Sequence, residues 1–106
     1  MIVDTPSHVV LTLVLPIEVE DALLETLLEH PTLAPGFTSQ RVEGQGQRVT
    51  FIGTAEHVRG RAACCRVELV APLGDAQALL DILRERFGTN RVFFWMVPVM
   101  ASGRLA

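Results

Sequence analysis

Two short segments of this chain are apolar on both faces, and this feature restricts its fold more than any other. Residues 8–15 read HVVLTLVL and residues 92–97 read VFFWMV, and a proline follows each segment. Apolar runs of this length, rich in Val, Leu and aromatic residues, predict strands that are covered on both sides. The fold must therefore place both segments in a sheet and supply a cover for each face of that sheet.

Two amphipathic helices are predicted, and together they can cover one face. In the first, apolar residues recur at helical spacing from Val19 to Leu27, and His30-Pro31 ends the helix because proline cannot continue the hydrogen-bond ladder. Its acidic residues form a solvated face to which we assign no function: Glu18, Asp21, Glu25 and Glu29. In the second, Asp75 is the predicted N-cap, Gly88 is the predicted C′ residue, and these residues form the apolar stripe: Ala76, Leu79, Leu80, Leu83 and Phe87.

The remaining segments predict two more strands and a long loop. Residues 61–70 alternate, with apolar residues at the odd positions from Ala63 to Leu69 and with Arg66 and Glu68 between them, which indicates a half-buried strand. Residues 37–42 alternate weakly and predict a shorter, exposed edge strand. Residues 43–60 are rich in Gly, Gln, Arg and Thr and predict a functional loop, with a β-arm at 48–52 and a helical turn at 54–59.

The element order is β-α-β-β-α-β, which predicts an α+β, ferredoxin-like fold with two helices on one face of a four-stranded antiparallel sheet. A chain of 106 residues suits one such domain, spanning 1–106. The second face of the sheet is left bare, and each apolar side chain exposed there would forfeit roughly 1.5–3 kcal/mol. We therefore expect homo-oligomerisation to cover this face, with Arg66 and Glu68 making the interface partly wet or charge-paired.

Charge and composition exclude several functional classes. Nine basic residues against twelve acidic ones give a net charge of -3, which argues against a nucleic-acid partner. Every basic residue is Arg, and the absence of Lys excludes a Walker-type phosphate site and Schiff-base chemistry. With no Tyr, and with no arrangement typical of acid–base or nucleophilic catalysis, we expect a non-enzymatic protein. No apolar run reaches the roughly 18 residues of a membrane helix and no signal peptide is recognisable, so we expect a cytoplasmic protein that does not insert into membranes.

The cysteines and histidines suggest metal binding as an alternative hypothesis. Cys64 and Cys65 are adjacent, so on a strand they point to opposite faces and cannot bind one ion together. We expect Cys65 to be a core residue and Cys64 an interface residue. As an alternative, Cys64 from each copy could bind a soft metal around a symmetry axis, with His57 of the long loop as a further ligand. Strand entry and helix end explain His8 and His30.

Arginine residues gather beside glycine at the predicted loops. Arg can hold a phosphate with two parallel hydrogen bonds, and backbone amides near Gly can cradle an anion. These segments could therefore converge on an anionic ligand between subunits, and solvated loop arginines are the alternative. The positions concerned are Arg59, Gly60 and Arg61 at the base of the loop, Arg91 after Gly88-Thr89-Asn90, and Arg104 after Gly103.

Nearly the whole chain resembles the PII-like signalling superfamily. The likeness lies in the element order, the long loop between the second and third strands, the short turn before the last strand and the C-terminal Gly-Arg. More narrowly, a small PII-like family of unknown function, associated with Gram-negative heavy-metal efflux systems, is similar to the segments LTLVLPIEVEDALLETLLEHP, GFTS, EHVRGR and FFWMVPVMASGR.

This resemblance implies a homotrimer with its sheets packed around a central axis. It also implies clefts between subunits that bind small effectors, often adenine nucleotides. The matching positions are Gly36, Phe37 and Thr38, then Gly60 and Arg61, then Gly88, Thr89, Asn90 and Arg91, and finally Gly103 and Arg104. The chain differs from nucleotide-binding PII proteins in having no Lys and a shorter C-terminal region.

The implied function is that of a regulator similar to nitrogen regulatory proteins, which senses an adenine nucleotide or a divalent metal. Its long loop would change order when the effector binds and would then engage or release a membrane transporter such as an efflux pump. Two alternatives remain open. One is a direct metal-binding or metal-tolerance module with Cys64 and His57 as ligands, and the other is a dimeric ferredoxin-like enzyme or amino-acid sensor with an even-numbered assembly.

Overall fold

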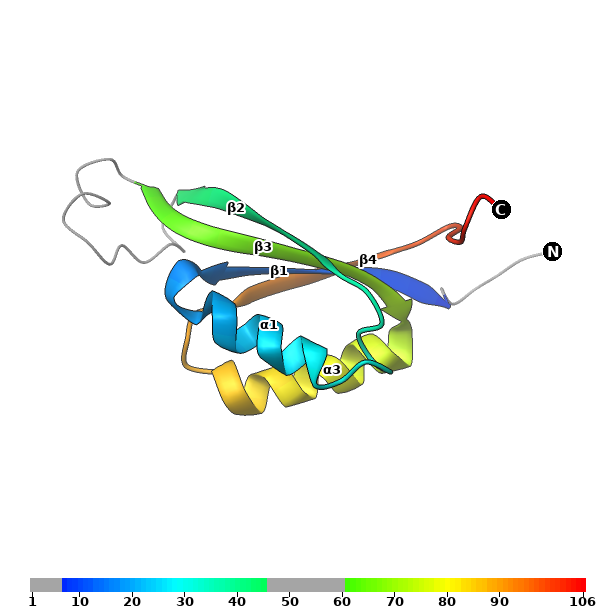
Figure 1. The fold of residues 1–106 in the computed structure, drawn as a ribbon, viewed down its shortest axis with the longest axis horizontal. Helices are drawn as coiled ribbons and strands as arrows, with labels where there is room; N and C mark the ends of the chain where they lie inside the picture. Colours follow the sequence, from blue (N-terminus) through cyan, green and yellow to red (C-terminus); the bar gives the residue numbers. More distant parts are fainter. Residues whose placement is uncertain (1–6, 46–60) are drawn as a thin grey trace.

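The computed structural model describes residues 7–45 and 61–106 and has the predicted element order within them. Figure 1 shows a sheet packed on one side against both helices, with the start of β1 and the C-terminal segment at the same end of the sheet. The elements are β1 (His8–Pro16), the 3₁₀ turn η1 (Ile17–Val19), α1 (Glu20–Leu28), β2 (Thr38–Gln45), β3 (Arg61–Pro72), α3 (Leu73–Phe87) and β4 (Phe93–Pro98).

The four strands are ordered β2-β3-β1-β4, and every neighbouring pair is antiparallel. The structure thereby confirms the α+β, ferredoxin-like fold, and it confirms that the strand after the first helix lies at an edge. The last strand, β4, lies at the other edge, although its apolar pattern is that of a covered strand. Its side chains therefore depend on something beyond the described chain for full burial.

The core lies between the sheet and the helices. Cross-strand register brings alternate residues of β1 and β3 to the helix-facing side, where Leu11 pairs with Leu69 and Leu13 with Val67. Cys65 shares this side and is fully buried, as predicted. The helices contribute one apolar stripe each, made of Leu23 and Leu27 from α1 and of Ala76, Leu79, Leu80, Leu83 and Phe87 from α3.

The opposite side of the sheet, here called the open face, has no helix over it within the described residues (Figure 1). Four large apolar side chains are exposed on it by between 39% and 47%: Val70, Phe93, Trp95 and Val97. Val10 and Val14 of β1 are only half-buried there. The predicted bare apolar face is therefore present.

Several predicted boundaries are wrong. The second helix begins at Leu73 with Pro72 as its N-cap, so Asp75 lies in the first turn, where its carboxylate faces the positive end of the helix dipole. The strand predicted at 37–42 starts at Thr38 and continues to Gln45, because its pairing with β3 extends to Arg61. Residues 43–45 of the predicted loop thus belong to β2. The rest of that loop, with the expected β-arm and helical turn, lies outside the described residues.

Gly88 follows the helix as predicted, but for a different reason. Its φ of -61° is right-handed, and the positive φ of this turn belongs to Arg91, at 56°. A Cβ at Gly88 would lie 2.6 Å from the Arg84 carbonyl oxygen, so the position needs glycine for space rather than for a left-handed backbone.

Across the described ranges, neither helix is long and apolar enough to cross a membrane.

Candidate functional site

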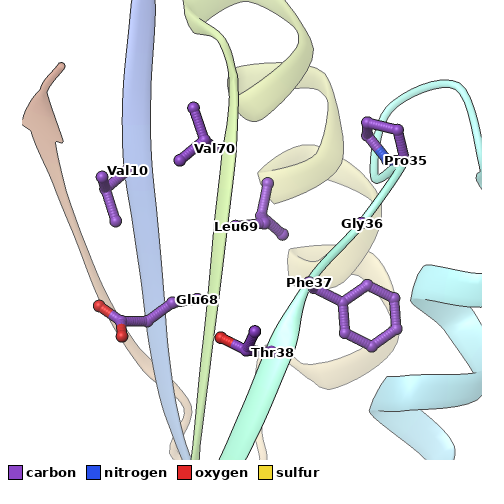
Figure 2. A pocket seen from close by; sticks show the side chains of 8 residues that line it. All are labelled: Val10, Pro35, Gly36, Phe37, Thr38, Glu68, Leu69 and Val70. Atoms are coloured by element: carbon purple, nitrogen blue, oxygen red, sulfur yellow. The ribbon is translucent and has the colours of Figure 1, made fainter. Parts of the chain in front are cut away.

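A groove opens at the sheet edge where β2 begins. Thr38, the first residue of β2, pairs with Glu68, but β3 continues to Pro72, so the last four residues of β3 have no β2 neighbour. The resulting groove has a volume of about 590 Å³ (Figure 2). It is lined by Val10, Pro35, Gly36, Phe37, Thr38, Glu68, Leu69 and Val70.

The groove combines apolar walls with a few polar groups. Figure 2 shows Val10 and Val70 beside each other on neighbouring strands, with the Phe37 ring turned toward the helices. Glu68 is the one charged residue among the described residues that line the groove. Its Oε2 accepts a hydrogen bond of 3.2 Å from the Thr12 hydroxyl. A carboxylate has further lone pairs, so Glu68 can still accept hydrogen bonds from a ligand.

The backbone of Val70 adds a donor and an acceptor to the groove. The Leu73 N–H donates to the Ser7 carbonyl at 3.0 Å, so the peptide groups of residue 73 face the β1 side. Along a strand, the peptide groups of successive residues point to opposite edges. Those of Val70, three residues earlier, therefore point away from β1 and into the groove, as a strand edge open to hydrogen bonding.

A second hollow of about 390 Å³ lies between the end of α3 and β4. Most of its wall is apolar, and Gly88, Arg84 and Arg91 also line it. The Arg84 guanidinium lies over the Phe94 ring at 5.5 Å from the ring centre, which is a cation–π distance. This hollow is lined by Leu13, Leu80, Leu83, Arg84, Phe87, Gly88, Arg91, Val92 and Phe94.

A polar cluster that the sequence did not predict joins α1 to β2. Arg41 donates to Glu20 Oε1 at 3.0 Å, and this hydrogen bond lowers the pKa of Glu20 below its ordinary value and raises that of Arg41. Burial, followed by a hydrogen bond to Glu20, raises the pKa of the Cys65 thiol to about 11. Cys65 is therefore protonated and unreactive at neutral pH, and the cluster has a structural character.

Comparison with known families identifies the chain. Residues 5–106 match the family of proteins of unknown function called DUF3240. The chain belongs to the DUF3240 family. Among curated proteins, none is similar enough in sequence to match.

Solved structures similar to this DUF3240 protein share its fold at low sequence identity. A DUF3240 family protein from Shewanella baltica OS155 has a TM-score of 0.76 and 22% identity, covering 96% of this chain and 100% of that one. CutA from Archaeoglobus fulgidus, a periplasmic divalent cation tolerance protein, has a TM-score of 0.67 and 12% identity, covering 92% and 88%. CPII from Thiomonas intermedia K12, a nitrogen regulatory PII-like protein bound to ADP, AMP and bicarbonate, has a TM-score of 0.60 and 17% identity, covering 90% and 94%. These likenesses confirm a PII-like fold.

The site residues expected for the DUF3240 chain fall in separate places within one protomer. Phe37 and Thr38 line the groove, whereas Gly88 and Arg91 line the second hollow, with Thr89 and Asn90 in the turn between them. The start of β2, which borders the groove, and the end of α3, which borders the second hollow, lie toward opposite ends of the sheet (Figure 1).

The other expected residues lie in neither cavity. Gly103 and Arg104 belong to the exposed C-terminal segment, which begins where the Val99 N–H donates to the His8 carbonyl. Arg61 is the first residue of β3, at the far end of that strand from Glu68. Gly60 and Arg59 lie outside the described residues. Among the described residues, one protomer therefore does not bring these segments together.

The residues proposed as metal ligands are not brought together in the described part of the chain. Cys64 and Cys65 point to opposite faces, and in the described chain neither forms a disulfide. Cys64 lies on the open face but is buried in one protomer, with only 7% of its surface exposed. His57 is outside the described residues. Over residues 7–45 and 61–106, no three or more metal-ligating side chains gather.

Proposed function

We propose that this DUF3240 protein is a non-enzymatic, homotrimeric PII-like regulator that binds a small effector in the groove at the start of β2. The observation that carries the proposal is the groove itself. It holds Phe37 and Thr38, which the PII resemblance assigns to the effector site, together with the Glu68 carboxylate and the open backbone edge of Val70.

The chemistry of the groove suits one part of an adenine nucleotide. The Val70 peptide offers a donor and an acceptor side by side, as the edge of a purine requires, and Val10 and Pro35 supply apolar walls for a flat ring. Glu68 and Thr38 can accept hydrogen bonds from ribose hydroxyls. Related folds take such ligands, since the CPII structure holds ADP and AMP.

Phosphates need positive partners that the groove does not contain. Its charged residue within the described chain is the acid Glu68, which would repel an anion. Two arginines that could bind a phosphate are exposed outside the groove: Arg91, in the turn before β4, and Arg104. In a trimer, these segments of one copy would complete the groove of its neighbour. The proposed site is therefore intersubunit.

Ligand titration tests this proposal. We expect one of ATP, ADP, AMP or a divalent metal to raise the melting temperature of the full chain, because a ligand that binds the folded state stabilises it. Gly36→Leu should fill the groove, since its Cβ meets nothing within 4 Å, and should weaken nucleotide binding at least tenfold without loss of folding. Gly74→Leu, at a glycine with equal space but in α3, is the control.

A second variant tests the phosphate arm. Arg91 has a φ of 56°, which Asn adopts readily, so Arg91→Asn removes the guanidinium with little backbone strain. A charged hydrogen bond to phosphate is worth about 1.5–3 kcal/mol, so nucleotide affinity should fall roughly 10- to 150-fold. Unchanged affinity in both Gly36→Leu and Arg91→Asn would reject the intersubunit site.

The efflux-pump partner and the cytoplasmic location implied by the resemblance belong to this proposal. The efflux-pump partner is tested by capture of a transporter with the tagged chain in the presence and absence of the effector. Direct metal binding is the competing function, favoured by the position of Cys64 on the face where copies would meet. It predicts that Cys64→Ser lowers the number of metal ions bound per trimer, whereas effector sensing through the groove predicts no change.

A further inference from the structure

The open face has an apolar side and a charged side. The apolar side is formed by β4, whose outward residues Phe93, Trp95 and Val97 are all exposed. The charged side is formed by β3, which carries Arg66 and Glu68 on the same face, one pleat apart. The face therefore presents one positive and one negative group beside a row of large apolar side chains.

Arg66 is incompletely satisfied in one protomer. Its Nε is buried and has no hydrogen-bond partner among the described residues. Its cross-strand neighbours, Gln40 on β2 and Val14 on β1, leave this donor unpaired. A buried donor without a partner costs free energy, so native structures rarely leave one unpaired.

A carboxylate of another copy can reach this Nε only if the partly exposed Arg66 side chain turns toward the open face, and Glu68 is the acid on that face. It is exposed, and one carboxylate oxygen, Oε2, accepts the Thr12 hydroxyl. The other oxygen, Oε1, takes no part in this hydrogen bond. The planar guanidinium group of arginine matches the geometry of a carboxylate, so Glu68 is a suitable partner for it.

We propose that, in the homotrimer of the proposed function, Arg66 of one copy pairs with Glu68 of the next where their open faces meet. A second copy fits this face because it carries one charge of each sign, so identical faces turned about a symmetry axis are complementary. This inference rests on the homotrimer of the proposed function and adds the contact that fixes its register. Ion pairs inside apolar interfaces act in this way, because a mismatched arrangement buries an unpaired charge.

The pair also joins assembly to the effector groove. Glu68 lines the groove, and its orientation is set by Thr12 on one side and by the neighbour's arginine on the other. Assembly therefore positions the acidic group that meets the effector.

Mixing of charge-reversed variants tests the intersubunit pair. Arg66→Glu leaves only acids at the two positions, and Glu68→Arg leaves only bases. We expect each variant to be a folded monomer at a concentration where the wild-type chain is trimeric, with at least a tenfold rise in the concentration needed for assembly. An equimolar mixture should form trimers that contain both chains, seen by native mass spectrometry, because two of the three contacts in such a trimer then join opposite charges. Glu25→Arg, on the exposed side of α1, is the control and should remain trimeric.

The double swap Arg66→Glu/Glu68→Arg provides the second measurement and should restore the homotrimer. Where a reversal prevents folding, the neutral pair Arg66→Met and Glu68→Gln replaces it, and the two substitutions should weaken assembly less together than the sum of their separate effects. Single reversals that stay trimeric, or a mixture without mixed oligomers, would overturn the pair while leaving the trimer intact. A wild-type chain that is monomeric would instead overturn the trimer of the proposed function.

Discussion

At the scale of single residues, the cluster of Cys65, Glu20 and Arg41 shows how position changes chemistry. Glu20 begins α1 and Arg41 lies on β2, and their hydrogen bond spans 21 residues of sequence. The buried Cys65 thiol lies against the same carboxylate, so both burial and the negative charge disfavour its thiolate. The thiol behaves as a small apolar group of the core.

Alkaline pH should destabilise the protein through Cys65. The unfolded thiol ionises near its ordinary pKa of 9.0 and the folded thiol only near 11, so between these values the unfolded state binds fewer protons and stability falls as pH rises. Because the chain has no Lys and no Tyr, few other groups titrate in this window. Urea unfolding at pH 8 to 11 should show this slope in the wild type and in Cys64→Ala, and a much smaller slope in Cys65→Ala. An equal slope in all three chains would contradict the assignment.

Gly88 should not tolerate a methyl group. The Cβ of Gly88→Ala would lie 2.6 Å from the Arg84 carbonyl oxygen, so the end of α3 must shift, at a cost of about 1–3 kcal/mol in the free energy of unfolding. Gly74→Ala is the matched control, because its Cβ has open space within α3 and alanine favours the helix by up to about 1 kcal/mol. Both are measured by denaturant unfolding at one protein concentration. Equal stability of the two variants would contradict the close contact.

At the scale of elements, the two helices are joined near their ends by one side chain. Arg86 of α3 donates to the Thr26 hydroxyl at 3.2 Å and to Glu29 Oε2 at 3.1 Å, just beyond the end of α1. The Arg86 and Glu29 side chains are about half exposed, so water and salt weaken their attraction. The contact orients two helices that already share the core.

Removing this link should have a small effect that depends on salt. Arg86→Met keeps most of the apolar stem and loses both contacts, so the free energy of unfolding should fall by about 0.5–1 kcal/mol at low salt and by less at high salt. Asp81→Asn serves as the comparison, since it weakens an ion pair with Arg84 that lies within one helix and is more exposed, and leaves the contact of Arg84 with Phe94 in place. Thermal unfolding at two salt concentrations measures both. A loss for Arg86→Met that is no larger than that for Asp81→Asn would show that the link is without consequence.

The same scale shows which parts of the fold the sequence could predict. The apolar run at residues 8–15 reveals β1 and the helical periodicity at residues 76–87 reveals α3, because each pattern reflects burial that the segment shows by itself. Strand ends depend on a partner: β2 extends to Gln45 because β3 is there to pair with it. The groove could not be predicted in full. Glu68 and Val70 lie beside Phe37 and Thr38 only because β2 starts at Thr38, and the sequence does not indicate that starting point. The contact of Arg41 with Glu20 could not be predicted from the sequence, since the two residues lie 21 positions apart.

At the scale of the whole molecule, the open face determines how copies of the chain assemble. Trp95 is the single tryptophan of the chain and lies on that face with 47% of its surface exposed. Its fluorescence therefore reports directly on whether the face is covered. The neighbouring residues Phe93 and Val97 are exposed to a similar degree.

Trp95 emission should shift to shorter wavelength as the protein concentration rises through the range of assembly, because the indole leaves water when copies pack together. The Arg66→Glu variant should keep the longer wavelength over the same range. Emission that is independent of concentration, at the wavelength of an indole in water, would indicate that the face stays wet.

Sedimentation equilibrium of the folded chain at micromolar concentration decides whether other copies cover the open face. We expect three times the protomer mass of 11.6 kDa. A stable, folded species of 11.6 kDa, or a dimer of twice that mass, would contradict this expectation.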